Sequence, residues 1–540
     1  MAVPKRVLLL TSAAYAGFRA RYGVGFTPFA AQSYVKNTLG VYVLLFFAQL
    51  FWGVFVYPLF LTPLRKLPTP EDGHFLLGHY ARIFKEPTGE PQRDWVDSVP
   101  NGGVIYYRFL FNDPRILITT PKALGEVLAQ RSYDFIKPKR VRVGLGRVLG
   151  VGVLLAEGDE HKRQRKLLMP AFNFRHVKDL YPIFWGKSQE MVNKISETIK
   201  NDPSGSSVVE IGSWGSRATL DIIGVAGCGK DFDALVNPEN ELYETYRQIF
   251  ASSRGAQVVQ IILGMIPYKI AINLPLKRND EIGNAVRTIK SVARDLIRSK
   301  RAKLESGEAK DLDILSVAME SGGFSDEDLV NQLMTFLAAG HETTASALSW
   351  AVYVLCKYPD VQKRLRSEIH EKIPSALEDG GQVSSTEIDH LPYLNAVLQE
   401  TMRVFPSVPL TLREAAQDTT IQGHFVPAGT TIVICPWAVN TSTQLWGPDA
   451  REFNPDRWMK PGTANTGGAE SNYAITTFLH GPRSCIGRDF AKAEFACLVA
   501  ALVGRFEFEF EDPEYKLEIQ GGITSKPKGG LRVKLRDVRA

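Results

Sequence analysis

The spacing of hydrophobic positions changes along the chain, and its first clear signal is an unbroken apolar run at 39–61. This run reads LGVYVLLFFAQLFWGVFVYPLFL, carries no charge and has Gln49 as its only strongly polar side chain. It is long enough for a helix across a hydrocarbon core of about 30 Å. Trp52 and Tyr57 lie toward one end, where interfacial aromatic residues are common. The pattern predicts a single transmembrane helix at 39–61.

The segments on either side of this helix are less regular. The N-terminal segment 1–38 contains a second apolar run at 7–18, which is too short to span a bilayer. Basic residues flank the predicted helix almost equally on both sides, so their distribution does not predict its orientation. Segment 62–72 contains Pro63, Pro68 and Pro70, which prevent a continuous helix. We interpret it as a stiff linker to a globular domain at 73–540.

Within the globular domain, helical spacing dominates from about residue 122 to residue 404. The clearest helical runs are 188–199, 284–304, 325–358 and 361–373. Runs at 104–111 and 115–120, separated by Asn112-Asp113-Pro114, predict a β-hairpin. Short strands are expected again within 419–435 and in a tail from residue 505. The predicted fold is mostly α with a small β region, in which one small sheet is built from both ends of the chain.

Composition and charge narrow the class of protein. The chain has 540 residues, 44% hydrophobic and 23% charged, which is typical of a folded protein with a large core. Its net charge of +6 is spread along the chain, which argues against nucleic acid binding and leaves open a basic face for an acidic protein or an anionic membrane. The five cysteines are scattered without a C-x-x-C pair, so neither a common zinc site nor a disulfide scaffold is expected. This cysteine usage indicates a reducing compartment.

The strongest chemical signal is the loop Phe478-Leu-His-Gly-Pro-Arg-Ser-Cys-Ile-Gly487. Gly481 and Gly487 permit tight turns and a close backbone approach to a flat cofactor. Phe478 is expected to pack beside the Cys485 sulfur, and Arg483 to pair with a carboxylate and add positive field near that sulfur. An apolar run follows at 490–503, so Cys485 precedes a helix whose N-terminus stabilises a thiolate.

This loop resembles the F-x-x-G-x-R-x-C-x-G haem-binding signature of the cytochrome P450 family at every fixed position. The resemblance covers about 67–535 and implies the cytochrome P450 fold, with haem b held by Cys485 as the metal ligand. A thiolate ligand favours O–O cleavage, so the implied chemistry is oxygen activation. The remaining cysteines lie in apolar contexts and are interpreted as small core residues: Cys228, Cys356, Cys435 and Cys497.

A long helix capped by Ser325 carries a second family element, Ala339-Gly340-His341-Glu342-Thr343-Thr344. Thr343 is expected to donate to the Ala339 carbonyl, which tends to bend a helix. The element resembles the family's A/G-G-x-D/E-T-T pattern. That resemblance implies that Thr343 holds dioxygen and its protonating water and that Glu342 relays protons, with Ala339 and Gly340 beside the haem. His341 is interpreted as a polar helix residue and not as a ligand.

Other charged residues match supporting positions of the family. Glu400 and Arg403 share a helix face, and with Arg457 the resemblance implies a buried charge network. Arg165 and Arg413 match positions that contact a haem propionate. His161 stands where the family usually has tryptophan, and it is also expected to contact a propionate.

The resemblance also implies partners and substrates. An acidic flavoprotein reductase is expected to dock on a basic cluster of Lys162, Arg163, Lys166, Arg488 and Lys492. The reductase would deliver electrons from NADPH, since the chain has no flavin or nicotinamide fingerprint. The residues expected to line the substrate pocket are Phe336, Ala339, Val408, Pro409 and Thr524. They are largely apolar, which predicts a lipophilic small molecule.

The style of anchor and linker resembles microsomal enzymes of fungal secondary metabolism. The sequence therefore predicts a monooxygenase that hydroxylates or epoxidises a terpenoid, polyketide or alkaloid intermediate. Its expected location is the endoplasmic reticulum membrane, with a single membrane pass and a cytosolic catalytic domain. A fatty-acid hydroxylase, a haem-thiolate isomerase or dehydratase, and a non-catalytic haem protein remain alternatives.

Overall fold

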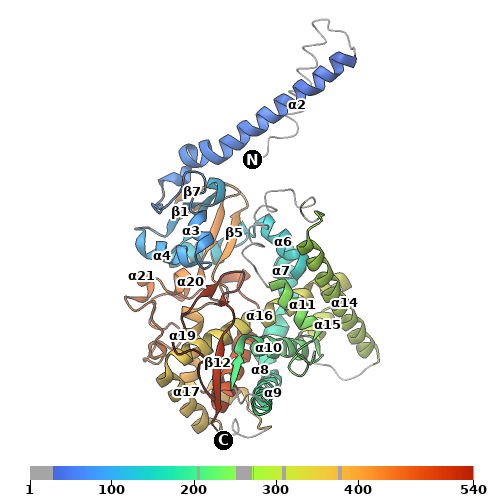
Figure 1. Cartoon of the computed structure of the whole chain (residues 1–540), viewed down its shortest axis with the longest axis vertical. Coiled ribbons are helices and arrows are strands. Elements are labelled where there is room, and N and C mark those ends of the chain that lie inside the picture. The colour runs from blue at the N-terminus through green and yellow to red at the C-terminus, as the bar shows by residue number, and fades with distance from the viewer. Residues whose placement is uncertain are drawn as a thin grey trace.

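The computed structural model describes residues 28–202, 207–250, 271, 273–306, 312–374 and 380–538, with side chains described from residue 39 onward. The apolar run at 7–18 lies outside these residues. The fold is mostly helical with several small sheets, as the sequence predicts. Figure 1 shows one long helix leaving a body that contains all other labelled elements.

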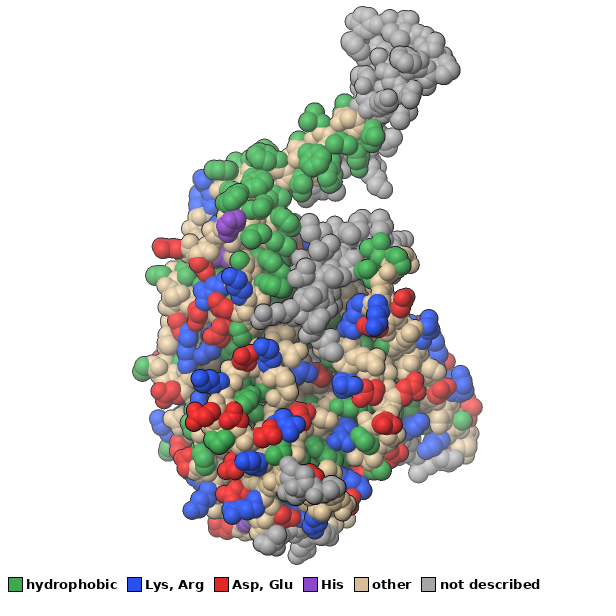
Figure 2. Space-filling model, viewed as in Figure 1, with side chains coloured by type: hydrophobic (Ala, Val, Ile, Leu, Met, Phe, Trp, Pro, Cys, Tyr) green, Lys and Arg blue, Asp and Glu red, His purple; other side chains and the backbone are tan. Residues whose placement is uncertain are grey.

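The projecting helix begins as α2 (Pro28–Phe51), well before the predicted start at residue 39, and continues as the π-helical segment η1 (Trp52–Leu61). The stretch Leu39–Lys66 has a mean hydropathy of 2.1 and is long and apolar enough to cross a membrane. Figure 2 shows its apolar side chains as a stalk continuous with an apolar area of the body. This single described candidate span is consistent with membrane anchoring.

The segment expected to be a linker is folded against the body. It forms the 3₁₀ helix η2 (Pro63–Lys66), with Leu64 and Leu67 buried in one of the hydrophobic clusters. The backbone N–H of Tyr106 donates to the Pro68 carbonyl at 2.8 Å. The segment contains only this short 3₁₀ helix and no continuous helix, as predicted from its prolines. Packing and hydrogen bonding hold it to the body.

A five-stranded sheet joins strands from widely separated parts of the chain in the order β1-β2-β8-β5-β3. Its strands are β1 (Val104–Arg108), β2 (Pro114–Ile118), β3 (Phe135–Ile136), β5 (Thr411–Ala415) and β8 (Thr431–Ile434). The predicted hairpin is present as the antiparallel pair β1 and β2, and β2 continues in parallel with β8. A separate pair, β6 (Thr419–Ile421) and β7 (His424–Val426), completes the strands predicted within 419–435.

The C-terminal strands do not join this sheet, so the prediction of one sheet built from both ends of the chain is wrong. Strands β9 (Phe506–Phe510) and β12 (Arg532–Asp537) pair with each other, and β12 also pairs with β4 (Val208–Glu210). Between them, β10 (Ile519–Gln520) and β11 (Lys526–Pro527) form a short hairpin. β9 follows the last helix without a loop, so its position is set by the end of that helix and not by the five-stranded sheet.

Helices form the rest of the body and enclose the largest hydrophobic cluster. The longer ones are α6 (Lys139–Leu149), α7 (Gly158–Leu168), α9 (Tyr181–Lys200), α10 (Ile211–Cys228), α11 (Glu241–Phe250), α14 (Lys277–Glu305), α16 (Asp326–Lys357), α17 (Pro359–Lys372), α19 (Pro392–Val404) and α22 (Arg488–Arg505). Shorter ones are α3 (Tyr80–Lys85), α4 (Glu90–Ser98), α5 (Pro121–Gly125), α8 (Phe174–Asp179), α15 (Ile314–Glu320), α18 (Ser385–Asp389), α20 (Pro436–Asn440) and α21 (Thr443–Trp446). All four predicted helical runs are present.

Helix α16 is the central element. Ser325 accepts a hydrogen bond from the Asp328 N–H at 3.2 Å, and Asp328 accepts one from the Ser325 N–H at 3.0 Å. This capping box satisfies two N–H groups at the start of the helix, so the predicted cap is confirmed. Beyond its first turn nearly every residue is buried, because α10, α14 and α22 pack around it. Such packing holds α16 rigidly, which is what a site on its surface requires.

Candidate active site

The loop before α22 presents Cys485 in a tightly constrained backbone. Gly481 has a φ of +75°, and a Cβ there would collide with the Leu128 backbone. The Cys485 N–H donates to the Phe478 carbonyl at 2.9 Å, which closes the loop. Cys485 is exposed, whereas the other four cysteines are buried as predicted for core residues. The loop thus offers one accessible sulfur at the start of a buried helix.

The charges that act on this sulfur differ in part from those expected. Surrounding protein raises the pKa of the Cys485 thiol, while a hydrogen bond from the Gly487 N–H and the positive charges of Arg165 and Arg488 oppose that rise. Arg165 also donates to the Ser484 carbonyl at 2.7 Å. Arg483 instead pairs with Glu157 at 2.6 Å, so the positive field predicted for it comes from Arg165 and Arg488. A metal ion at the sulfur would favour the thiolate further.

Close to Arg483 lies a cluster of cations with too few acidic partners. Arg413 is buried and donates to the Leu412 carbonyl at 2.9 Å, and burial together with Arg483 lowers its pKa to about 10. Burial, Arg413 and Arg483 also lower the pKa of Lys137 well below its ordinary value, and the Glu157 carboxylate opposes this. Two further carboxylates would neutralise the excess charge. The propionates of haem meet that requirement, so the residues present fit this cofactor.

His161 belongs to the same cluster. It is buried on α7, and its Nδ1 lies 3.0 Å from the Tyr133 hydroxyl. Burial, followed by the charges of Arg483 and Arg165, lowers its pKa to about 4. The ring is therefore neutral at pH 7, with Nε2 as the nitrogen available to the predicted carboxylate partner.

One face of α16 carries Phe336, Ala339 and Thr343, which are three and four residues apart and so lie along one side of the helix. Ala339 is exposed although it lies in the middle of the most buried helix. The Phe336 ring lies 5.7 Å from that of Phe172, and Phe172 also lies beside Gly487 of the cysteine loop. Phe172 therefore joins this face of α16 to the loop. Ala339 on this face and Cys485 in the loop are both exposed.

Thr343 donates to the Ala339 carbonyl at 2.9 Å, as the sequence predicts. Gly340, in contrast, is turned toward α10, where a Cβ would lie 2.9 Å from Ile223. Its missing side chain therefore serves a close helix–helix contact, and a place beside the cofactor stays a prediction. His341 is buried against Tyr246 of α11, consistent with its interpretation as a non-ligand.

Glu342 lies on a third side of α16 and faces the C-terminal hairpin. Its Oε1 accepts hydrogen bonds from the Thr524 hydroxyl at 3.0 Å and from the Lys526 ammonium at 3.3 Å. Thr343 is not among its hydrogen-bonding partners. Nothing in the sequence connects Lys526 with Glu342, since the two residues are far apart in the chain.

The charge network expected from Glu400, Arg403 and Arg457 is assembled in the structure. Arg403 donates to both oxygens of Glu400 at 2.8 Å, and Arg457 donates to Oε1 at 3.0 Å. Trp458 donates to Oε2 at 2.9 Å, a contact that the sequence did not predict. Glu400 and Arg403 have no exposed surface, so every charge here depends on its bonded partners.

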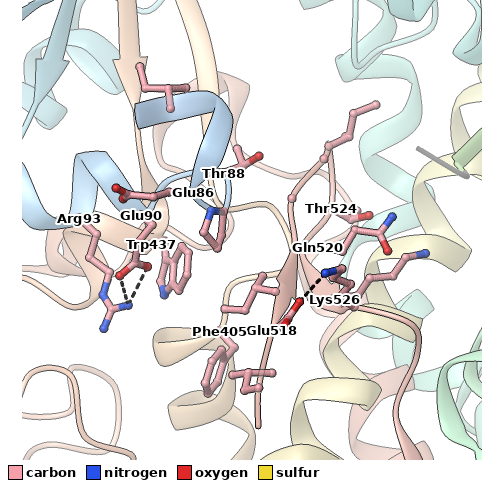
Figure 3. Close-up of a pocket in the computed structure, with 18 of the residues that line it drawn as sticks. Glu86, Thr88, Glu90, Arg93, Phe405, Trp437, Glu518, Gln520, Thr524 and Lys526 are labelled. Carbon is pink, nitrogen blue, oxygen red and sulfur yellow. Dashed lines mark hydrogen bonds and ion pairs between the residues drawn. The ribbon is translucent and has the colours of Figure 1, made fainter. Parts of the chain in front are cut away.

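A cavity of about 1430 Å³ opens to solvent beside the site. Figure 3 shows Glu90, Arg93 and Trp437 on one side of it, with Thr524, Gln520 and Lys526 on the other. Thr524 is the one predicted pocket residue in its lining. Phe336 and Ala339 belong to the α16 face described above, and the Pro409 carbonyl accepts hydrogen bonds from Cys435 and Trp437. Neither Pro409 nor Val408 borders this cavity.

A buried acid on α22 escaped the sequence prediction. Glu494 has no exposed surface, lies beside Thr344 of α16, and burial raises its pKa well above the ordinary value. Its signal in the sequence was a single carboxylate within the apolar run at 490–503. Burial therefore favours the uncharged form of this carboxyl group.

The basic cluster expected to bind a reductase is partly neutralised. Lys162 pairs with Asp159 at 2.8 Å, Arg163 with Glu160 at 2.7 Å and Arg488 with Asp489 at 2.8 Å. Lys492 is half-buried, and burial lowers its pKa. Lys166 is exposed and has no ion pair among the described residues. The predicted docking charge is therefore concentrated at fewer positions than the sequence suggests.

The accessible cysteine and the cation-rich wall beside it define a haem-thiolate protein. A family model described as cytochrome P450 matches residues 68–533, which extend from the proline-rich segment to the last strand. The chain therefore belongs to the cytochrome P450 family, and it is an oxidoreductase of the haem-thiolate monooxygenase class.

Curated relatives from fungi agree with this assignment. The chain is 48% identical over 496 residues to cytochrome P450 monooxygenase sphH of Aspergillus fumigatus, with 91% of each chain covered. It is 44% identical over 540 residues to cytochrome P450 monooxygenase FUM15 of Gibberella moniliformis, with 90% of each covered. It is 41% identical over 549 residues to cytochrome P450 monooxygenase ALT8 of Alternaria alternata, covering 90% of this chain and 92% of the relative.

Proposed function

We propose that this protein binds haem b through Cys485 and inserts one oxygen atom from dioxygen into a lipophilic secondary-metabolite intermediate. The second oxygen atom leaves as water, and NADPH supplies two electrons through a separate flavoprotein reductase. The observation that carries the proposal is the accessible Cys485 sulfur beside a buried excess of cations. The fungal origin of the relatives supports the assignment to secondary metabolism.

The predicted site residues have distinct roles in this proposal. Cys485 is the iron ligand, while Arg165, Arg413, Arg483 and His161 hold the propionates. When bound, the haem supplies oxygen activation, which a thiolate ligand favours. Thr343 orients dioxygen and a water molecule beside the exposed Ala339, and Glu342 carries protons from the solvent-facing cavity. The buried network of Glu400, Arg403 and Arg457 keeps the surrounding core rigid.

The location follows from the anchor. The apolar stretch Leu39–Lys66 holds the protein in the endoplasmic reticulum membrane with the catalytic domain in the cytosol, where the reductase also acts. A lipophilic substrate partitions into the same membrane. Terpenoid, polyketide and alkaloid intermediates all satisfy this chemistry, as does a fatty acid.

The deciding experiment is a reduced carbon monoxide difference spectrum of the full-length protein in detergent. Wild type is expected to show the long-wavelength Soret band of a thiolate-ligated haem, and Cys485→Ala to lose it. Cys356→Ala, which removes a buried cysteine from the end of α16, is the matched control and should retain the band. Retention of the band by Cys485→Ala would contradict the proposed ligand.

Two further measurements test the reaction and the substrate. Product formation that requires NADPH and reductase would exclude an isomerase or dehydratase, which needs neither. Comparison of metabolites with and without the gene would then show which intermediate accumulates. An unchanged set of metabolites after deletion of the gene, or turnover without NADPH, would overturn the monooxygenase assignment.

A further inference from the structure

The C-terminal hairpin is attached to one stripe of α16 at three successive positions. Glu342, Ser346 and Trp350 lie four residues apart and therefore form one stripe along the helix. Ser346 donates to the Ser525 carbonyl at 2.6 Å, and the Trp350 indole N–H donates to the same carbonyl at 3.1 Å. Thr524 and Lys526, on either side of Ser525, both bind Glu342. These contacts fix the hairpin beside Glu342.

The two donors use the same oxygen of Glu342. Thr524 and Lys526 both donate to Oε1, whereas no described residue donates to Oε2. Glu342 and Thr343 are consecutive, so their side chains leave the helix about 100° apart. The Thr343 hydroxyl is bonded within its own helix. A proton passing between the two side chains must therefore travel through water. Oε2 is the Glu342 oxygen that accepts no hydrogen bond from the described residues.

The same two hairpin residues border the solvent-facing cavity. The Lys526 side chain is 39% exposed, while that of Glu342 is 11% exposed. Figure 3 shows Thr524 and Lys526 projecting from the hairpin on the side away from Trp437. Lys526 therefore lies between solvent and an acid that is almost withdrawn from it. Because solvent screens such a pair only weakly, the Lys526 ammonium constrains where the carboxylate lies.

We propose that Lys526 is a positioning residue for proton delivery: from the wall of the cavity, its ion pair holds the Glu342 carboxylate in place. Thr524 completes the clamp on Oε1. Oε2 is left to exchange protons with water. This inference rests on the proposed function. It assigns to the C-terminal hairpin a part in proton delivery through its contact with Glu342.

Proton supply decides where the electrons from NADPH go. Two electrons and two protons reduce dioxygen to hydrogen peroxide, and four of each reduce it to two water molecules. In productive turnover two electrons and two protons convert one oxygen atom to water while the other enters the substrate. Peroxide formation and productive turnover both consume two protons, but only productive turnover requires the second proton at the oxygen atom that leaves as water. When that proton is not delivered, the oxygen leaves as peroxide, so the ratio of peroxide formed to NADPH consumed reports proton delivery.

The test compares Lys526→Met with Lys526→Arg in full-length holoenzyme whose carbon monoxide spectrum shows thiolate ligation. With a purified reductase, NADPH and lauric acid as the lipophilic probe, Lys526→Met should raise peroxide per NADPH by about threefold or more, and raise the solvent deuterium isotope effect on NADPH use. Lys526→Arg keeps the charge and should stay near wild type. Glu342→Gln should reproduce the effect, and the double variant should add little to it.

The matched control is Lys528→Met. Lys528 lies on the same hairpin but pairs with Glu518 at the surface, so its loss should leave the peroxide ratio unchanged. The acetylation rate of the Lys526 amine by an amine-reactive ester, measured by mass spectrometry, tests the ion pair without turnover. Glu342→Gln should raise that rate at least about twofold. Unchanged peroxide in Lys526→Met, or an equal rise in Lys528→Met, would overturn the inference while the intact spectrum leaves the proposed function standing.

Discussion

At the scale of single residues, buried carboxylates in this protein differ in the hydrogen-bond donors that surround them. Glu400 accepts hydrogen bonds from two arginines, an indole and a backbone N–H. Asp221 on α10 also has no exposed surface, but its donors among the described residues are the N–H groups of Ala234 and Leu235, at 2.8 and 2.9 Å. Burial outweighs these two bonds and raises the pKa of Asp221 to about 6.

This pKa predicts a pH-dependent stability that Asp221→Asn should remove. The folded-state pKa lies above the ordinary value, so the contribution of Asp221 is fully present below about pH 4 and is lost as pH rises through 6. A shift of about two units corresponds to roughly 2–3 kcal/mol. Thermal unfolding midpoints of the full chain in detergent, measured between pH 4 and pH 7.5, should fall for wild type relative to Asp221→Asn. Parallel pH profiles for the two proteins would contradict the expectation.

At the scale of elements, the junction between anchor and body is held by polar contacts to a helix interrupted by proline. Pro58 has no N–H, so in a regular helix the Val54 carbonyl would lack its partner. Asn112, in the turn of the β1–β2 hairpin, donates to that carbonyl at 3.0 Å, and the Tyr106 hydroxyl donates to the Pro58 carbonyl at 3.2 Å. The body therefore supplies a donor in place of the N–H that Pro58 lacks, and a second donor to the Pro58 carbonyl. The anchor and the sheet region are joined as one unit.

Asn112→Asp should loosen this junction. Asn112 is buried with a φ of +58°, which Asn and Asp both tolerate, and its amide also donates to the Phe75 carbonyl at 2.6 Å. Asp keeps the size and removes both donors, which costs on the order of 1–3 kcal/mol for each unsatisfied group. Hydrogen exchange at residues 59–67 in vesicle-bound protein should become faster. Tyr106→Phe, which loses only the bond to Pro58, should have a smaller effect, and unchanged exchange in both would refute a rigid junction.

At the scale of the whole molecule, the anchor and the predicted reductase face lie on different parts of the body. Figure 1 places the anchor beside β1 and β7, whereas the predicted reductase face is formed by α7 and the start of α22. Most of the charges on that face pair with acids of their own helices, so the net attraction for an acidic partner rests mainly on Lys166. Long-range attraction between proteins depends on such unpaired surface charge.

Lys166→Glu should therefore weaken reductase association without changing the haem site. The reductase concentration for half-maximal NADPH-driven turnover is expected to rise several-fold at low salt, with little difference at high salt because ions screen the charge. Lys303→Glu, at an exposed position near the end of α14, is the control with the same charge change. Equal effects of the two substitutions would argue for net charge alone and against this docking face.

How far the sequence predicted the molecule depends on whether the determining contacts are local. The membrane helix, the hairpin at β1–β2, the Ser325 cap and the cysteine loop follow from runs and short motifs, because their hydrophobic spacing, caps and turns involve near neighbours. The network of Glu400, Arg403 and Arg457 was predictable only through family resemblance. The partners of Glu342 and Val54 were not, since Lys526 and Asn112 reach them through tertiary packing.

By itself, the sequence determined that this protein is an anchored, mostly helical cytochrome P450 with Cys485 as its candidate iron ligand. Only the tertiary structure decided that Gly340 packs against α10, that Arg165 and Arg488 act on the Cys485 sulfur, and that the C-terminal strands form their own sheet. The reason is physical: side-chain electrostatics and close contacts depend on distances between residues that are remote in the chain. Local patterns specify which elements form, and packing specifies which of their faces meet.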